Sequence, residues 1–209
     1  MLGVSNLHLL TSEAVSHAVT AGECDPATLV WKDVPMVPAY FYEHREKNQW
    51  GGVTLVKSQP AHSQPAHSQP ALLLRVPGAI VDSSTSMCSE GVSANMLFRV
   101  DTATVGFVNG VEERCVAYLR DHPDYLGYTN YRDDDWAPTV ICGSQLNVKV
   151  IKGDSFAAVD ASTGHLIRDP VALRDMHASD VILRFGGLWR SYGTAAASWF
   201  LLGGSFKYE

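Results

Sequence analysis

The pattern of apolar and polar positions near the C-terminus predicts a β-hairpin. A partly alternating apolar run at residues 181–185 meets Gly186-Gly187, and a polar bend closing at Tyr192-Gly193 precedes a second apolar and aromatic run. Two such runs joined by a short glycine-containing bend are typical of antiparallel strand pairs. Glycine pairs inside strands are typical of bulges, so we expect Gly186-Gly187 to bend the first strand and to shift its register.

The hydrophobic period changes to that of a helix in the middle of the chain. Apolar residues at positions 107, 111, 115, 118 and 119 fall on one helical face, and polar residues such as Glu112 and Arg120 fall on the other. Proline cannot continue a helix, and Pro123 follows closely. The pattern therefore predicts a helix over residues 107–121.

Shorter apolar runs predict further strands. Residues 72–77 form a run that stops at a proline, and residues 92–100 alternate like a half-buried strand. A short helix is expected over residues 12–21, ended by Gly22. Other strands are expected at residues 29–31, 37–42, 53–56, 139–142, 146–151, 156–159 and 165–168. A mainly β chain with one clear helix between its strands indicates a β-barrel or sandwich with a helical insertion.

Residues 58–71 contain nearly three copies of the unit SQPAH. A proline at every fifth position forbids a helix and favours polyproline-like extension. The repeat is either a docking segment or His-rich tract, or an expanded loop between two strands, and we favour the loop. We expect it to belong to a single domain over residues 1–209, with residues 126–137 as a second extended, aromatic-rich loop.

Composition limits the kind of protein this chain can be. Of its 209 residues, 46% are hydrophobic and 18% charged, which is typical of a globular protein. The net charge of −6 argues against coating nucleic acid by bulk electrostatics. A local basic groove remains compatible with it, because charges act within about 8–10 Å at moderate salt. The final hairpin is locally basic, with Arg184, Arg190 and Lys207.

The four cysteines and the apolar runs bear on location. Cys24, Cys88, Cys115 and Cys142 are scattered without a CxxC pair, so we expect free thiols in a reducing compartment. No apolar run approaches the roughly 20 residues that cross a bilayer. We therefore expect an intracellular protein without membrane association.

The sequence contains no recognisable catalytic or metal-binding motif. GxSxG, a Walker loop, GxGxxG and HExxH are all missing from it. Three adjacent aspartates at residues 133–135 could bind a divalent ion, but their carboxylates cannot all converge, and we expect a solvated loop. We therefore expect no enzymatic activity, cofactor or metal. A metal-independent hydrolase assembled from distant residues is kept as a third hypothesis.

The candidate ligand-binding residues gather at the terminal hairpin. Trp189 and Tyr192 flank its bend, and in a strand without a bulge Arg184, Arg190 and Tyr192 would share one face. Aromatic rings stack on bases for roughly 1–3 kcal/mol each, and cations hold phosphates. Trp189 could equally be a core residue, and Trp199, Phe200 and Phe206 are expected in the core. Further strand cations that could line a groove, each otherwise a solvated residue, are Lys57, Arg75, Lys149 and Lys152.

Taken together, these segments resemble the single-stranded DNA-binding proteins of large nucleocytoplasmic DNA viruses. That family is similar in fold to the OB-fold single-stranded DNA-binding proteins of short-tailed phages. The resemblance covers roughly residues 70–209 and is carried by LLLRVP, VSANMLFRV, the helix FVNGVEERCVAYLRD, the Pro-led strand pair at 138–152, and the hairpin VILRFGGLW…YG…SWFLL. The SQPAH repeat departs from the family, as does the ending FKYE, where phage relatives carry an acidic tail that recruits partners.

The resemblance implies an OB-fold-like β-barrel with a helical insertion and extended loops. It also implies a non-enzymatic protein that coats single-stranded DNA during replication or recombination, in the host nucleus or at a cytoplasmic viral replication site. Viral replication proteins and further copies of the chain would be its partners. The alternative is an all-β viral structural or capsid-associated protein with no nucleic-acid role, for which two facing sheets of a jelly roll would be expected.

Overall fold

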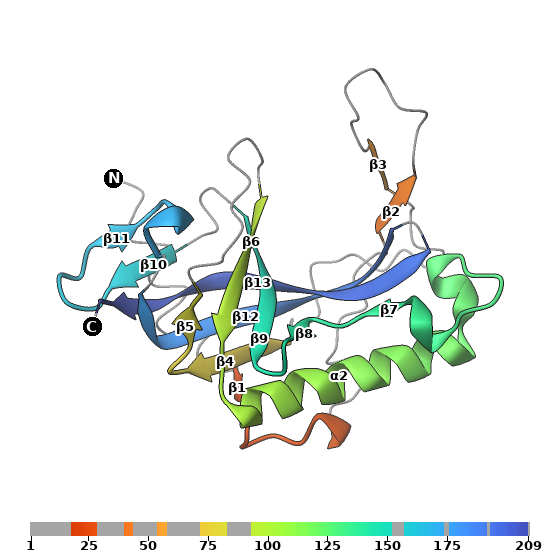
Figure 1. The fold of residues 1–209 in the computed structure, drawn as a ribbon, viewed down its shortest axis with the longest axis horizontal. Coiled ribbons are helices and arrows are strands. Elements are labelled where there is room, and N and C mark those ends of the chain that lie inside the picture. The colour runs from red at the N-terminus through yellow and green to blue at the C-terminus, as the bar shows by residue number, and fades with distance from the viewer. Residues whose placement is uncertain are drawn as a thin grey trace.

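A long β-hairpin near the C-terminus organises the fold (Figure 1). Its strands are β12 (His177–Ser191) and β13 (Thr194–Lys207), which pair antiparallel along nearly their whole length. The structure is a computed structural model that describes residues 18–28, 40–43, 54–57, 72–82, 93–151, 157–173, 176–191 and 193–208. The predicted terminal hairpin is confirmed, and it is longer than its apolar runs suggested.

Five strands close a barrel around part of this hairpin. The path runs from β12 through β5 (Ile80–Val81), β6 (Ser93–Arg99) and β9 (Gln145–Ile151) to β13, which returns to β12. The segment β4 (Leu73–Pro77) leads into β5 and makes most of the contact with β12. When the five barrel strands are numbered in chain order from β5 to β13, neighbours around the barrel follow the order first, second, third, fifth and fourth, and the fourth strand pairs again with the first. The contact between β9 and β13 is parallel. The expected OB-fold-like barrel is confirmed.

The barrel core follows from the alternation seen in the sequence. Successive side chains of a strand point to opposite faces, so every second residue of β4, β6 and β9 enters the interior. The residues that do so are at most 1% exposed: Leu74, Val76, Met96, Phe98, Leu146, Val148 and Val150. Each such side chain stabilises the fold by about 1.5–3 kcal/mol relative to exposure, so the alternation accounts for the strand register.

The helix α2 (Thr102–Asp121) is five residues longer at its start than predicted. The carboxylate of Asp101 accepts a hydrogen bond from the backbone N–H of Thr104 at 2.8 Å, which caps the first turn. The residues TATVG that open the helix carry no clear apolar period, so periodicity missed them. The helix ends at Asp121, before Pro123, as predicted.

One residue of the predicted polar face of α2 is buried. Glu112 is 4% exposed, and its carboxylate accepts hydrogen bonds from the backbone N–H of Thr139 at 3.2 Å and from Nε1 of Trp136 at 3.3 Å. Burial raises the pKa of Glu112, and these hydrogen bonds oppose the rise. The expectation that Glu112 faces solvent is therefore wrong, because the segment after the helix folds back over it.

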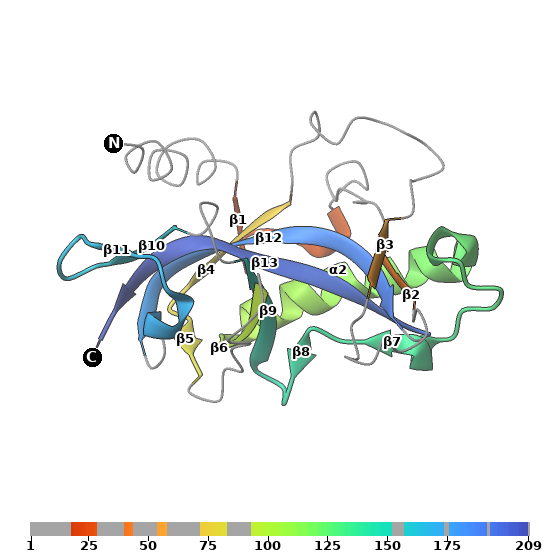
Figure 2. The same cartoon turned by 90° about the horizontal axis from the view of Figure 1, so that it is seen from above.

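Additional strands extend the sheet at both ends of the hairpin (Figures 1 and 2). At one end β10 (Ala157–Asp160) pairs parallel with β13 and antiparallel with β11 (Leu166–Ile167), which confirms the expected turn between them. Near the tip the hairpin pairs with β7 (Trp136–Ala137) and β2 (Tyr40–Glu43), and β2 pairs with β3 (Thr54–Lys57). The strands β8 (Val140–Ile141) and β9 form the pair expected around Gly143-Ser144.

The first described segment differs from its prediction. Val19 and Thr20 form β1 (Val19–Thr20), paired parallel with β4, where the end of a helix over residues 12–21 was expected. Both residues are β-branched and favour a strand wherever a sheet edge is available. Residues 12–17, the strand expected at 29–31 and the repeat at 58–71 lie outside the described residues, and the single-domain organisation stays a prediction.

Short 3-10 helices complete the described chain. They are η3 (Pro26–Thr28), η5 (Pro123–Leu126), η6 (Asp133–Asp135) and η7 (Pro170–Leu173). Cys24, Cys115 and Cys142 are free thiols, and Cys88 is outside the described ranges. Across the described part of the chain, no helix combines the length and apolar content that crossing a bilayer requires.

Candidate nucleic-acid interface

A bulge in β12 decides which side chains of the hairpin share a face. The pairing steps from Phe185 opposite Trp199 to Leu188 opposite Ala197, so β12 uses one residue more than β13. Gly187 has a φ of 92°, a conformation that favours glycine. The extra residue reverses the alternation beyond it. The expected bulge is confirmed, and the shared face that a regular strand would give Arg184 and Arg190 is not formed.

The inner face of the hairpin belongs to the hydrophobic core. Phe185 and Trp199 are buried there with ring centroids 5.2 Å apart, and Leu188 is buried beside them. Phe206 is also fully buried. The core expectation is confirmed for Trp199 and Phe206.

Phe200 differs from that expectation and faces outward. It follows the inward-facing Trp199 in a regular stretch of β13, so it lies on the opposite face and is only half-buried. Gly186 leaves room for its ring, because a Cβ atom at Gly186 would overlap the ring carbons of Phe200. The core expectation for Phe200 is therefore wrong.

The outward residues form one continuous row across four strands. By register Asn95 of β6 is the neighbour of Lys149 of β9, Lys149 of Phe200 in β13, and Phe200 of Arg184 in β12. Adjacent strands in a sheet are about 4.8 Å apart, so the four side chains are near neighbours. We call this row, with the adjoining Ser198 and Trp189, the outer patch.

Lys149 and Trp189 contact each other within the outer patch. The Nζ atom of Lys149 lies 4.7 Å from the ring centroid of Trp189 and donates a hydrogen bond to Oγ of Ser198 at 3.3 Å. Burial lowers the pKa of Lys149. Trp189 is half-buried on the outer face, and its Nε1 donates to the carbonyl of Ala197 at 3.4 Å. Trp189 is therefore not a core residue.

Arg184 is the second cation of the outer patch. Its guanidinium carbon lies 5.4 Å from the ring centroid of Phe200, and its buried Nε has no hydrogen-bond partner among the described residues. Within the same residues, neither Arg184 nor Lys149 forms an ion pair with a carboxylate. A buried polar atom without a partner costs about 1–3 kcal/mol, so an incoming anion would relieve that cost.

Arg190 lies on the opposite face of the hairpin and contacts the segment that follows α2. Its guanidinium carbon is 3.9 Å from the ring centroid of Tyr128, and its Nη1 donates to the carbonyls of Leu126 at 3.1 Å and Gly127 at 2.6 Å. The hydroxyl of Tyr128 donates in turn to the carbonyl of Gly193, in the hairpin turn. Burial raises the pKa of Tyr128, although the nearby Arg190 opposes the rise.

The other predicted site residues fall outside the outer patch or outside the described side chains. Arg75 forms an ion pair with Asp180, with Nη2 2.7 Å from a carboxylate oxygen, and this contact raises the pKa of Arg75. For Lys57 only the backbone is described, as the last residue of β3. Lys152 and Tyr192 lie outside the described residues. Of the eight candidates, the structure brings Arg184, Lys149 and Trp189 together.

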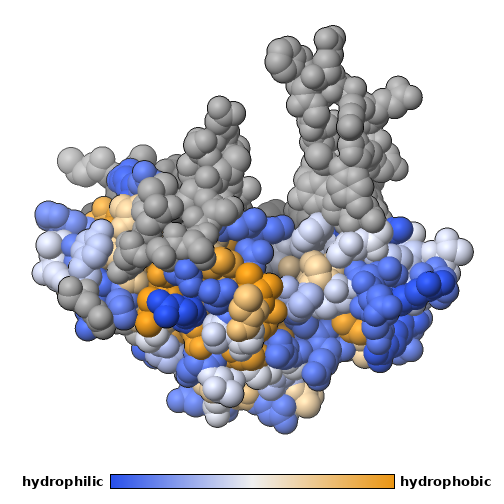
Figure 3. All heavy atoms as spheres, in the orientation of Figure 1, coloured by the Kyte–Doolittle hydropathy of each residue, from blue (hydrophilic) through white to orange (hydrophobic). Residues whose placement is uncertain are grey.

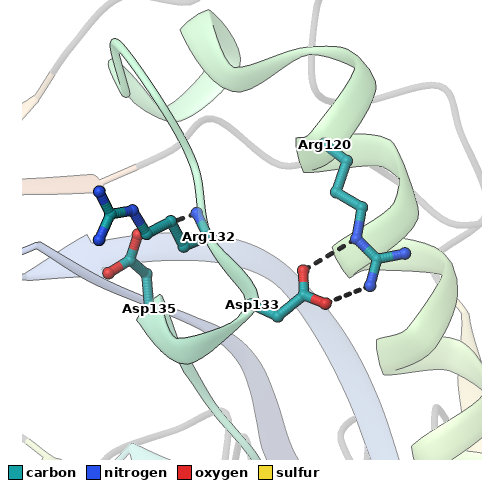
Figure 4. A network of polar contacts seen from close by, with 4 residues as sticks. All are labelled: Arg120, Arg132, Asp133 and Asp135. Carbon is teal, nitrogen blue, oxygen red and sulfur yellow. Dashed lines mark hydrogen bonds and ion pairs between the residues drawn. The ribbon is translucent and has the colours of Figure 1, made fainter.

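Two of the three adjacent aspartates, Asp133 and Asp135, have structural partners (Figure 4). Arg120 of α2 binds both carboxylate oxygens of Asp133, and this contact lowers the pKa of Asp133. The carboxylate of Asp135 accepts the backbone N–H of Arg132 at 3.0 Å, which begins η6. In the ranges that the structure describes, no three His, Cys, Asp or Glu side chains are grouped to hold a metal ion.

The surface around these elements is divided by character (Figure 3). On the face shown, hydrophobic residues gather over the barrel strands, and hydrophilic residues dominate around the C-terminal end of α2.

Sequence reasoning missed Asn95, Ser198 and Phe200 as members of the outer patch, and Tyr128 as the partner of Arg190. Alternation outward from the buried Trp199 could have placed Ser198 and Phe200, whereas Asn95 and Tyr128 required the three-dimensional pairing.

No protein-family model and no curated protein matches the sequence. Three solved structures of the single-stranded DNA-binding protein from bacteriophage Enc34 are similar to the chain. The C-terminal truncation has 8% identity and a TM-score of 0.43, and the match covers 81% of this chain and 94% of that chain. The protein without that truncation has 9% identity, a TM-score of 0.42, and coverage of 79% and 88%. Its complex with single-stranded DNA has 9% identity, a TM-score of 0.40, and coverage of 81% and 94%.

Proposed function

We propose that this chain is a non-enzymatic single-stranded DNA-binding protein of viral type, which coats DNA exposed during replication or recombination. The observation that carries the proposal is the outer patch. There Lys149 and Arg184 lie beside the rings of Trp189 and Phe200, without a carboxylate partner among the described residues.

The chemistry of the outer patch suits a single strand. Cations bind the phosphates, and exposed aromatic rings stack on bases that are free of a complementary strand. Lysine and arginine that already neutralise a carboxylate, as Arg75 does, are less available for phosphate. Lys149 and Arg184 have no such competitor in the described part of the chain.

The position of the outer patch on the barrel supports the same function. OB-folds bind oligonucleotides on the face of the second and third strands and through the loop that joins the fourth and fifth. In this barrel those strands are β6 and β9, and that loop is the tip of the β12–β13 hairpin. Asn95 and Lys149 lie on the first surface, and Trp189 lies near the second.

The closed barrel favours this function over the structural alternative. An all-β structural or capsid-associated protein would be expected to form two facing sheets, whereas these strands close on themselves. Binding a single strand requires no nucleophile, metal or cofactor, so we propose no enzymatic activity. The viral setting is supported by the sequence resemblance alone. On that basis we propose viral replication proteins and further copies of the chain as partners, at a replication site in the host nucleus or cytoplasm.

Titration of the full chain with fluorescein-labelled oligo-dT tests the proposal. We expect micromolar or tighter binding that quenches tryptophan fluorescence and weakens steeply between about 50 and 200 mM salt. Duplex DNA of the same length should bind more weakly, because its bases cannot stack on Trp189 and Phe200. An oligo-rU arm reports any preference between DNA and RNA. Failure to bind oligo-dT at low salt would overturn the proposal.

A further inference from the structure

Two side chains attach the tip of the β12–β13 hairpin to the segment that follows α2. Arg190 lies at the end of β12, next to the turn. Its guanidinium donates hydrogen bonds to the carbonyls of Leu126 and Gly127 and stacks on the ring of Tyr128. Tyr128 donates its hydroxyl to the carbonyl of Gly193 in the turn itself. The two contacts therefore hold the tip both before and within its turn.

The segment that receives the hairpin is itself well anchored. Tyr128 is 7% exposed, and its ring meets that of Tyr131 edge-on at 5.2 Å. Gly127 ends η5 with a φ of 69° and donates its N–H to the carbonyl of Asp124 at 2.9 Å. Because η5 follows α2 after one residue, and α2 is buried along one face, this segment is connected directly to the core.

We propose that Arg190 and Tyr128 are positioning residues for single-stranded DNA: they hold the hairpin tip, and with it Trp189, without contacting the ligand. The inference rests on the proposed function. Arg190 and Trp189 are consecutive and point to opposite faces of β12, so holding Arg190 fixes the rotation of the strand about its axis. That rotation sets where the ring of Trp189 lies in the outer patch.

The hairpin needs such a restraint because it projects beyond the closed barrel. A two-stranded hairpin alone is marginally stable in water. Near the tip its described strand neighbours are two residues of β7 and three register positions of β2. A ligand that binds a pre-ordered aromatic ring avoids the cost of immobilising it, which is about 0.5–1.5 kcal/mol for one side chain.

The test compares the variants R190A and Y128F with the contact variant R184A in the full chain. Affinity for fluorescein-labelled oligo-dT is measured over a series of KCl concentrations. We expect R190A and Y128F to bind roughly two- to tenfold more weakly than the wild type. The salt slope, which is the steepness with which the logarithm of the binding constant falls with the logarithm of the KCl concentration, should stay unchanged in both variants. R184A should lower the slope by about 0.7, because it removes one phosphate contact. Y128F keeps the ring beneath Arg190 and removes only the hydroxyl, so it stays informative if R190A folds poorly.

Matched controls separate positioning from loss of charge or of a hydrogen bond. R168A removes one exposed arginine next to β11, at the other end of the hairpin. Y208F removes a second tyrosine hydroxyl that donates to a backbone carbonyl, that of Ala172. Both controls should bind oligo-dT like the wild type. A salt slope for R190A that falls as far as that of R184A would show phosphate contact and overturn the inference, as would unchanged affinity in both R190A and Y128F.

Hydrogen exchange of the free protein tests the attachment independently of DNA. In R190A and Y128F, amides of peptides covering residues 188–197 should exchange faster than in the wild type, while those of β6 and β9 stay protected. Equal exchange at the tip in all variants would overturn the inference. If the wild type fails to bind oligo-dT, the proposed function falls, and exchange at the tip still decides whether these two residues hold the hairpin.

Discussion

The ring of Phe200 lies over Gly186, on the outer face of the hairpin, in the space that a side chain at position 186 would occupy. Gly186 belongs to the bulge of β12, and Phe200 is the register neighbour of both Lys149 and Arg184. The glycine therefore does more than bend the strand. It allows an aromatic ring to lie between the two cations of the outer patch.

Substitution of Gly186 should consequently harm both stability and binding. We expect G186A to lower the free energy of unfolding by about 1–3 kcal/mol, because its Cβ forces the ring of Phe200 to move. Chemical denaturation measures the loss, and oligo-dT titration should show weaker binding. G106A is the matched control: nothing in the described structure lies within 4 Å of a Cβ there, and Gly106 is inside α2. It should stabilise the protein by roughly 0.5–1 kcal/mol. A G186A protein as stable as wild type would show that the ring is not held by the glycine.

The aromatic residues of the outer patch should each contribute to affinity. We expect W189A and F200A to weaken oligo-dT binding by about 1–3 kcal/mol each, the usual contribution of one stacked base. W189A should also remove most of the fluorescence quenching, although the chain has five tryptophans. Tyr208 is 63% exposed and outside the outer patch, so Y208A should bind normally. Normal binding by both W189A and F200A would exclude the outer patch as the stacking surface.

The charge of Lys149 should lower the stability of the fold and strengthen the binding of single-stranded DNA. Burial lowers its pKa, so the charged amine is disfavoured in the folded state. K149M keeps most of the packing and removes the charge. We expect an unfolding midpoint equal to or above that of the wild type, together with weaker oligo-dT binding and a salt slope lower by about 0.7. The same salt slope in K149M and wild type would mean that Lys149 contacts no phosphate.

Glu112 should make stability depend on pH in an identifiable direction. Because burial raises its pKa, the folded protein keeps this proton at pH values where the unfolded chain has lost it. The contribution of Glu112 to stability therefore decreases as pH rises from its ordinary pKa through the raised value, and is constant above both. E112Q should remove that part of the pH dependence, which denaturation at a series of pH values measures.

A second variant checks the hydrogen bonds of Glu112. E112A should cost about 1–3 kcal/mol at every pH, because the N–H groups of Thr139 and Trp136 lose their acceptor. If E112A and E112Q were equally stable, an acceptor oxygen at position 112 would add nothing to the contacts between α2 and the β7–β8 segment.

Local sequence patterns predicted much of the fold, because many elements follow from the order of apolar and polar residues within the element itself. The alternation around Met96 and Phe98 predicts a half-buried strand without knowledge of its partners, and the proline at 123 marks where α2 must stop. The bulge was also predictable from its glycines. Which of the two faces Arg184 and Arg190 each take was not, because that depends on the register with β13.

The candidate site was predictable only in part, for a related reason. Lys149, Arg184 and Trp189 could be chosen by residue type, yet Lys149 reaches Trp189 through the β9–β13 contact, between segments distant in the chain. The partner of Arg190 lies 63 to 64 positions away, in a segment that looked like an ordinary polar loop. Lys57, Lys152 and Tyr192 stay predictions.

The bulge at Gly186-Gly187 determines which face of the sheet each later side chain of β12 occupies. Because β12 contains one extra residue there, every residue beyond the bulge lies on the face opposite to the one that a regular strand would give it. A strand of the same length without the bulge would alternate regularly from end to end. Leu188 and Arg190 would then face outward, and Trp189 would turn toward the segment after α2. Loss of the bulge at unchanged length would thus exchange the ligand surface and its anchor, whereas deletion of Gly187 would remove the extra residue and keep Trp189 on the outer face.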